Sequence, residues 1–243
     1  YYLVQLNVLK VDEYVKSRIR YEKRHYILSE IYDKSKSDYE KGEDDSEICQ
    51  IIRNDSLDEF IGYITAKNIE LYKPKIERSD LETNNFIINN KPTLIEYAAF
   101  FGSFKIVKYL AENGSKLRKI LWSFAIHGRN FDIIHLLEEK KVWHDPIESY
   151  KMAIKCHHND LAYYIKEKYF SDQKKPFNCL PYGLKFYNFE YVEKEKINRL
   201  VFHHLCYYDY TLFVDILLKN EKIDINKLKK FDKILQFDFS MEF

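Results

Sequence analysis

The sequence predicts an all-α fold, a helical-repeat solenoid of about six helix-turn-helix units behind a helical N-terminal segment. Three observations lead to this expectation. The 243 residues include only six glycines and five prolines, too few for the many tight turns of a β-sandwich or barrel. Apolar residues recur at helical spacing through most of the chain. Finally, several segments resemble one another at intervals of 27 to 30 residues, which is typical of stacked repeats.

The N-terminal part differs from the rest. Residues 1–33 carry apolar side chains at helical intervals, such as Leu3, Leu6 and Val15, and predict two or three helices. The stretch from Lys34 to Glu47, KSKSDYEKGEDDSE, has no pattern for burial and is typical of an exposed linker. We therefore expect a boundary near residue 45, with residues 1–45 forming the helical N-terminal segment and its charged linker.

The repeats follow this boundary. Tyr97–Leu110 aligns with Phe124–Leu137 at an offset of 27, and Met152–Ile165 follows at 28. A small residue in the first helix of a unit lets the next unit approach closely, and the second helix supplies an apolar stripe. The shared small residues are Ala98, Ala125 and Ala153, and weaker copies cover 48–64, 182–192 around Gly183 and 202–218 around Cys206.

These units predict a repeat stack over residues 46–226. One unit cannot bury both of its faces, whereas several stacked units can, so the stability of the stack comes from contacts between neighbours. Residues 227–243, KLKKFDKILQFDFSMEF, match no repeat. They are expected to form a C-terminal tail or an edge cover.

One unit carries a family resemblance. The segment TLIEYAAFFG, followed by the pairs IV, YL and GS, resembles the ankyrin consensus TPLHxAAxxG followed by IV, LL and GA. Leu94 and Glu96 stand where the consensus has proline and histidine. The train of short, divergent units resembles the expanded ankyrin-like proteins of trichomonad-type protists. The resemblance implies a rigid, non-catalytic surface that binds a protein partner without a cofactor.

Composition excludes several other functions. A net charge of +1 gives no overall field that would gather nucleic acid or coat an anionic membrane. No stretch reaches the 18 or more apolar residues of a spanning helix. The basic clusters at Lys166–Lys175 and Lys227–Lys233 do not repeat in register, so we interpret them as solvated surface rather than as a nucleic-acid site.

The sequence offers no catalytic or metal-binding motif. The six glycines form neither GxGxxG nor GxxxxGK, so no phosphate cradle is expected. Two clusters, Cys156-His157-His158 and His203-His204-x-Cys206, lack the spacing of zinc ligands. His204 and Cys206 would point apart on a helix. We expect no enzyme activity, no metal, no cofactor and no small-molecule substrate.

The candidate binding residues are those that the repeat leaves variable. By the resemblance, positions after the small pair face a concave groove, and these are Phe100, Phe101, His127 and Lys155. Two adjacent phenylalanines cannot both enter the core of a regular helix, so an exposed ring could anchor a partner. The alternative is that one ring caps the core and the other packs on the leader segment. Trp143, in the loop from Lys141 to Pro146, is a further candidate.

The sequence thus predicts a cytoplasmic protein-binding module or scaffold. The alternative is a constitutive architectural subunit of a large assembly, such as a cytoskeletal lattice, because abundant tyrosine and phenylalanine also suit permanent burial against neighbours.

Overall fold

The computed structural model describes residues 42–71, 76, 79, 81–171, 179–193 and 199–219. The regular structure in these residues is α-helical, with no strand among them, which confirms the all-α prediction for this part of the chain. The predicted N-terminal helices (1–33) and the predicted tail (227–243) lie outside the described residues. None of the described helices has the length and apolar character needed to cross a membrane.

The chain divides after Lys140 into two compact units, so the residues expected to form one stack (46–226) fall in both. The first unit contains the described helices α4 (Glu47–Arg53), α5 (Leu57–Ala66), α6 (Asn85–Asn90), α7 (Leu94–Phe100), α8 (Phe104–Glu112), α9 (Leu121–Gly128) and α10 (Phe131–Glu139). The second contains α11 (Pro146–Lys155), α12 (Asn159–Phe170), α13 (Leu180–Lys185), α14 (Glu190–Glu193), α15 (Arg199–Tyr207) and α16 (Thr211–Lys219).

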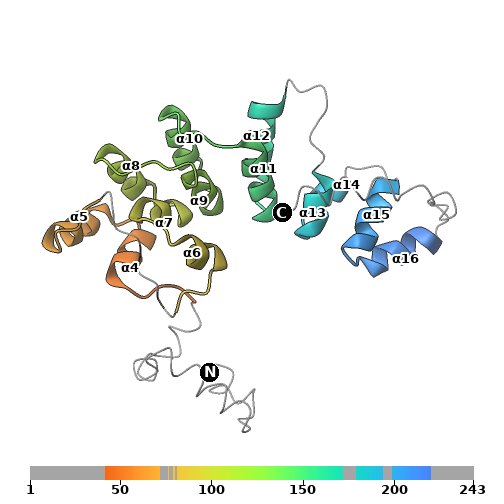
Figure 1. Ribbon diagram of the computed structural model, residues 1–243, viewed down its shortest axis with the longest axis horizontal. Helices are drawn as coiled ribbons and strands as arrows, with labels where there is room; N and C mark the ends of the chain where they lie inside the picture. Colours follow the sequence, from red (N-terminus) through yellow and green to blue (C-terminus); the bar gives the residue numbers. More distant parts are fainter. Residues whose placement is uncertain are drawn as a thin grey trace, which may run out of the picture. The chain divides into compact units, whose positions relative to one another are not determined.

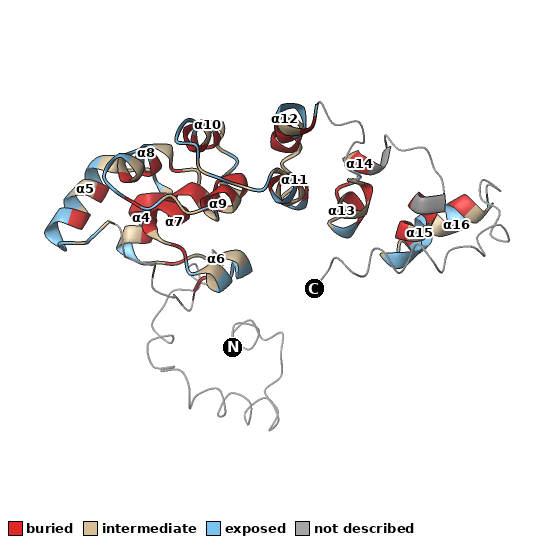
Figure 2. Cartoon of the chain, turned by 45° about the horizontal axis from the view of Figure 1, so that its top comes forward, coloured by how far each residue is buried: buried red, intermediate tan, exposed pale blue. Residues whose placement is uncertain are grey.

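Apart from α6, the helices form consecutive pairs joined by short turns (Figure 1). In the first unit α7 contacts α4 on one side and α9 on the other, while α8 contacts α5 and α10. In the second unit α13 contacts both α11 and α15. The helices turn their buried residues toward their neighbours (Figure 2). Each unit therefore buries its apolar side chains between successive helix pairs.

The turn inside each pair has the same backbone conformation. Its central residue is left-handed, and in five of the six pairs the next amide bonds back to the carbonyl five residues earlier, as in Ser103 to Ala98 at 2.9 Å and Asn188 to Gly183 at 2.7 Å. This is a Schellman helix end. Only one of the central residues is a glycine; the six, in order, are Asp55, Gly102, Arg129, His157, Tyr187 and Asp209.

The turns define a common register for all pairs. Ala98, Ala125 and Ala153 each lie four residues before the left-handed residue and are fully buried. Gly183 holds the same position in the fifth pair. In the last pair, however, the position belongs to buried Leu205, and Cys206 is exposed. The sequence alignment centred on Cys206 was therefore wrong by one residue.

Side chains also link successive pairs within each unit. The residue that follows the left-handed position donates a hydrogen bond to a backbone carbonyl of the preceding pair. The bonds run from Ser103 Oγ to Ile52 at 2.6 Å, from Asn130 Nδ2 to Gly102 at 2.9 Å, from Asn188 Nδ2 to Ile154 at 3.0 Å and from Tyr210 OH to Leu184 at 2.6 Å. These bonds satisfy carbonyls that the close packing of the pairs removes from water.

Candidate binding surfaces

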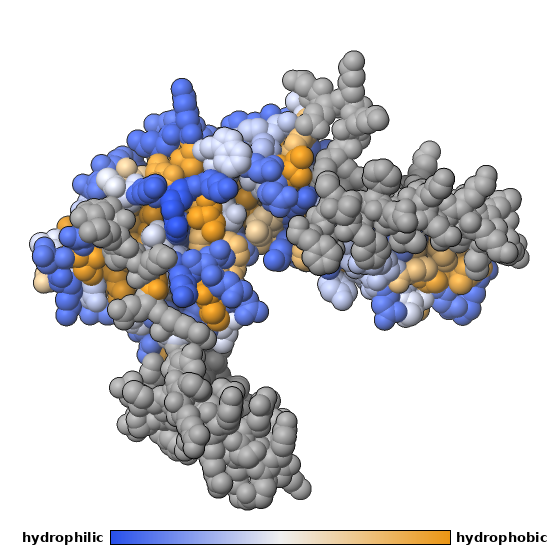
Figure 3. Space-filling view, in the orientation of Figure 1, coloured by the Kyte–Doolittle hydropathy of each residue, from blue (hydrophilic) through white to orange (hydrophobic). Residues whose placement is uncertain are grey.

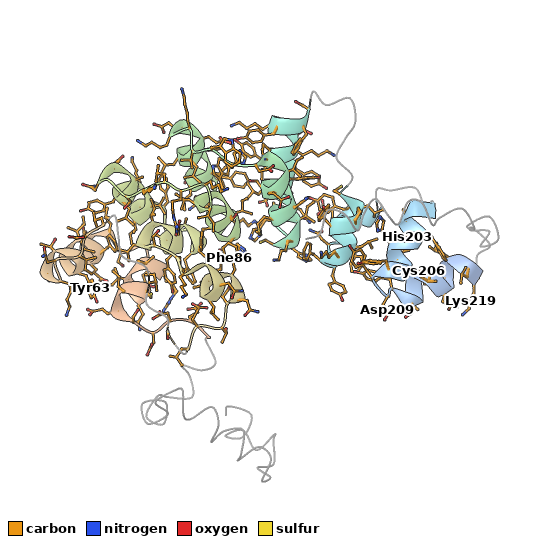
Figure 4. The ribbon with its side chains drawn as sticks, in the orientation of Figure 1. Tyr63, Phe86, His203, Cys206, Asp209 and Lys219 are labelled. Atoms are coloured by element: carbon orange, nitrogen blue, oxygen red, sulfur yellow. The ribbon has the colours of Figure 1, made fainter. Side chains whose placement is uncertain are left out.

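Phe86 of α6 lies at the centre of an aromatic cluster in the first unit (Figure 4). Its ring centroid is 4.3 Å from that of His127, 4.8 Å from that of Phe124 and 6.2 Å from that of Phe100. The Asn84 side chain accepts the Phe86 amide at 3.0 Å and so caps the start of α6. Sequence analysis had assigned no role to this short helix.

The structure brings together Phe100 and His127, two of the candidate binding residues. Their ring centroids are 5.0 Å apart, and each lies two residues before the left-handed residue of its pair. Both side chains are half-buried, because Phe86 packs against them. The covering ring thus comes from α6, and the leader segment considered in the sequence analysis lies outside the described residues.

Phe101 lies 5.1 Å from Phe100, ring centroid to ring centroid, and also contacts Tyr97 and Arg53. Its ring lies 4.8 Å from that of buried Tyr97, and the Arg53 guanidinium is 5.7 Å above it. Arg53 also donates to the Tyr97 hydroxyl at 2.7 Å. Neither adjacent phenylalanine enters the core completely, and neither is fully exposed. Phe101 therefore helps to join α4 to α7.

The Glu96 side chain, at the position of the consensus histidine, is fully buried. Arg118 donates to both of its carboxylate oxygens, at 2.8 and 2.6 Å, and the Thr93 amide donates to it at 2.9 Å. The hydrogen bond to Glu96 raises the pKa of Arg118. This bidentate pair ties the loop before α9 to the start of α7.

In the second unit, Lys155 of α11 occupies the position that Phe100 and His127 occupy in theirs. It is exposed, and its ammonium lies 5.6 Å from the Phe186 ring centroid. The common register adds two residues that the sequence analysis missed, Lys185 and Tyr207. The left-handed backbone of the turn residues reveals this register, which the sequence hides because no single amino acid marks all of these turns.

Trp143 lies in the loop between α10 and α11 and is 66% exposed. The loop is fixed beside it by His144, whose Nδ1 is 2.8 Å from Ser149 Oγ and whose ring packs edge-on against Tyr169 at 5.0 Å. Trp143 is thus an exposed aromatic side chain on an anchored loop. Its predicted role in partner binding stays a prediction.

A larger aromatic surface lies on α13 to α16, where the sequence analysis placed no site. We call Tyr187, Phe189, Tyr210 and Phe213 the turn patch. Tyr210 lies 5.7 Å from Tyr187, 5.6 Å from Phe189 and 6.1 Å from Phe213, and Phe189 stacks on Phe213 at 5.9 Å. The sequence analysis missed these rings because tyrosine and phenylalanine are abundant throughout the chain.

The turn patch is both exposed and fixed in position. Tyr187 is 66% exposed and Phe213 is 44% exposed, while the Tyr210 hydroxyl holds the patch on the Leu184 carbonyl. Burial raises the pKa of Tyr210, so its hydroxyl stays a donor at neutral pH. Leu212, at 69% exposure, and Ile216 extend the apolar surface along α16. Figure 3 shows apolar side chains over the pair formed by α15 and α16.

Two cysteine thiols of the described residues have raised pKa values. Burial raises the pKa of the Cys49 thiol and of the Cys156 thiol to about 11 each, so both stay protonated and unreactive at neutral pH. His204 is buried whereas Cys206 is exposed on the same helix, as the i, i+2 spacing predicted. No group of three or more His, Cys, Asp or Glu side chains among the residues described could hold a metal ion.

A surface hollow of about 560 Å³ lies between α4 and α5. Tyr63, labelled in Figure 4, lines it together with Glu59 and Lys67. Its lining includes no cysteine, histidine or serine.

Comparisons with protein-family models, with curated proteins and with solved structures gave no match. The function is therefore argued from these surfaces alone.

Proposed function

We propose that the chain is a non-catalytic, ankyrin-like helical-repeat module that binds a protein partner through exposed aromatic side chains. The observation that carries this proposal is the turn patch. Six of the eight large apolar side chains exposed among the described residues lie on α13 to α16 or their turns: Tyr187, Phe189, Tyr207, Leu212, Phe213 and Ile216. Such concentration of exposed apolar area is typical of a binding surface.

Aromatic side chains suit this role for physical reasons. They bury a large area on binding, and they lose little conformational entropy when the rings are already held by their neighbours. In the turn patch each ring contacts at least one other ring of the patch. A partner would therefore meet a preformed surface.

The repeated geometry supports the helical-repeat part of the proposal. In the described residues, six left-handed turn residues recur inside the helix pairs, each with a buried residue four positions earlier. Sequence similarity between the later pairs is slight, but the backbone repeats. Regular stacking of such pairs produces a rigid extended surface.

The proposal is tested by cross-linked affinity isolation from native lysate with the full chain. The test variant is Phe213→Glu in the turn patch, and the matched control is Ile147→Glu, which also replaces one exposed apolar side chain. We expect wild type and control to retain one predominant partner that the test variant loses. With that partner purified, calorimetry should show at least a tenfold weaker Kd for the test variant.

Two results would oppose the proposal. If all three proteins retain the same salt-resistant heavy assembly, the architectural alternative is favoured and the turn patch is not the contact. If no protein is retained by any of them, a partner-binding module is contradicted. Circular dichroism of each variant must first show unchanged helix content.

A further inference from the structure

Three lysines of the second unit lie over aromatic rings on α11 and α13. Lys151 Nζ is 4.9 Å from the Tyr182 ring centroid, Lys155 Nζ is 5.6 Å from that of Phe186, and Lys185 Nζ is 6.0 Å from that of Phe186. We call Lys151, Lys155, Tyr182, Lys185 and Phe186 the lysine–aromatic stripe. Two neighbouring helices thus present cations and rings together.

Helix geometry explains why these side chains share one face. Lys151 and Lys155 are four residues apart, as are Tyr182 and Phe186, and residues at this spacing lie one above the other along a helix. Because α11 packs against α13, each lysine of α11 reaches a ring of α13. His157 Nε2 donates to the Phe186 carbonyl at 2.7 Å and fixes the end of the stripe.

The stripe keeps its positive charge. A ring attracts an ammonium group through its quadrupole and does not neutralise it. Lys155 and Lys185 are exposed, and Lys155 makes no ion pair with a carboxylate of the described residues. Lys151 does pair with Glu148, at 2.8 Å. The lysines next to Phe186 therefore combine exposed cations with an apolar floor.

We propose that the lysine–aromatic stripe binds an acidic segment of a protein partner. One carboxylate of that segment would lie between Lys155 and Lys185, and an apolar side chain next to it would cover Phe186. This inference rests on the proposed protein-binding function and adds the chemistry of the partner at a second surface, distinct from the turn patch.

Charge complementarity favours a polypeptide over a nucleic acid here. Specific nucleic-acid binding commonly uses on the order of 6–10 phosphate contacts, whereas the stripe has only three lysines. The net charge of +1 gives no long-range attraction for a polyanion. A short acidic segment matches the number of cations available.

The test measures fluorescence anisotropy of a labelled ten-residue polyglutamate peptide with the full chain, at 50 mM salt. The variants are Lys155→Glu/Lys185→Glu and the milder Lys155→Gln/Lys185→Gln. A matched control, Lys140→Glu/Lys166→Glu, makes the same change in net charge at exposed sites outside the stripe. Labelled polyglutamine and ten-residue polyuridine RNA serve as competing probes, and circular dichroism checks folding.

We expect saturable polyglutamate binding that weakens at least tenfold in Lys155→Glu/Lys185→Glu, at least threefold in the glutamine variant and less than twofold in the control. Equal binding by wild type and both stripe variants would overturn the inference, as would no binding at all. Tighter binding of polyuridine than of polyglutamate would replace it with a nucleic-acid site. None of these results depends on the turn patch, so the two proposals fail separately.

Discussion

Asn188 and Ile154 are joined across two helix pairs, because the Asn188 side-chain amide donates to the Ile154 carbonyl at 3.0 Å in a buried position. The same amide donates to Asn159 Oδ1 at 2.7 Å, and Asn159 in turn donates to Glu190. Tyr163 also donates to Glu190, at 2.7 Å. One side chain therefore connects α11, α12 and α14.

Asn188→Ala should destabilise the second unit by about 2–3 kcal/mol, since it leaves the buried Ile154 carbonyl and the Asn159 side chain without this donor. Urea unfolding followed by circular dichroism measures the change. The control is Asn113→Ala, whose exposed side chain bonds only one turn back, to the Tyr109 carbonyl. A shift no larger in Asn188→Ala than in the control would contradict the role assigned to this link.

Replacing glycine by alanine should change the stability of the first unit in opposite directions at Gly128 and Gly62. A Cβ at Gly128 would lie 2.1 Å from the Ala99 carbonyl oxygen and 2.9 Å from the Gly102 nitrogen, so Gly128→Ala must push α9 away from α7 and should cost about 3 kcal/mol. A Cβ at Gly62, within α5, would meet nothing within 4 Å. Gly62→Ala should stabilise by up to about 1 kcal/mol. Thermal unfolding of both variants checks the pair, and a stable Gly128→Ala protein would refute the close approach.

Glu82 should make the first unit less stable as pH rises. Burial raises its pKa, as do the nearby carboxylates of Asp44 and Glu43, against hydrogen bonds that lower it. The folded state therefore binds the Glu82 proton more tightly than the unfolded state, so stability is greatest below the unfolded pKa and declines as pH rises through the folded pKa. One carboxylate oxygen, Oε2, has no hydrogen-bond partner among the described residues.

Glu82→Gln removes this titration and keeps an oxygen for the Asn84 amide, which Glu82 accepts at 2.8 Å. We expect it to stabilise the protein by about 1 kcal/mol at pH 7 and to lose this advantage as the pH is lowered to 4. Midpoints of thermal unfolding between pH 4 and 8 give the comparison. A constant difference across that range would show that Glu82 does not titrate as described.

The pair between Glu96 and Arg118 should be strongly coupled. Arg118→Leu leaves a fully buried carboxylate without its cation and should cost about 2 kcal/mol, at the low end for buried pairs because the Arg118 side chain is 39% exposed. Glu96→Gln/Arg118→Leu should recover part of this loss, since the neutral amide needs no counter-ion. A double-mutant cycle by urea unfolding measures the coupling, and strictly additive effects would contradict it.

The register of the best-matched units could be predicted from the residues. Gly102 marks the turn in the Tyr97–Leu110 segment, and the buried alanines 98, 125 and 153 align with it. In the other pairs the left-handed residue is arginine, histidine, tyrosine or aspartate. These amino acids do not by themselves predict a left-handed turn. For this reason the sequence alignment of the last pair was centred on Cys206 instead of Leu205.

The candidate binding surfaces could likewise be predicted only in part from the sequence. The repeat placed Phe100 and His127 at equivalent positions, but it did not predict the covering ring of Phe86 from an unassigned helix. The sequence also did not predict the turn patch, because in a chain rich in tyrosine it does not indicate which aromatic side chains are exposed. Only the contacts of Tyr210 show that the patch is preformed.

The sequence by itself determined the helical class and the pairing of neighbouring helices, because scarce glycine and proline and the spacing of apolar residues act locally along the chain. The tertiary structure decided which side chains are covered, which pairs of polar groups are buried and where exposed rings gather. These properties depend on contacts between residues far apart in the chain, such as Arg118 with Glu96, 22 positions apart, or Ser103 with Ile52, 51 positions apart, and no local pattern encodes them.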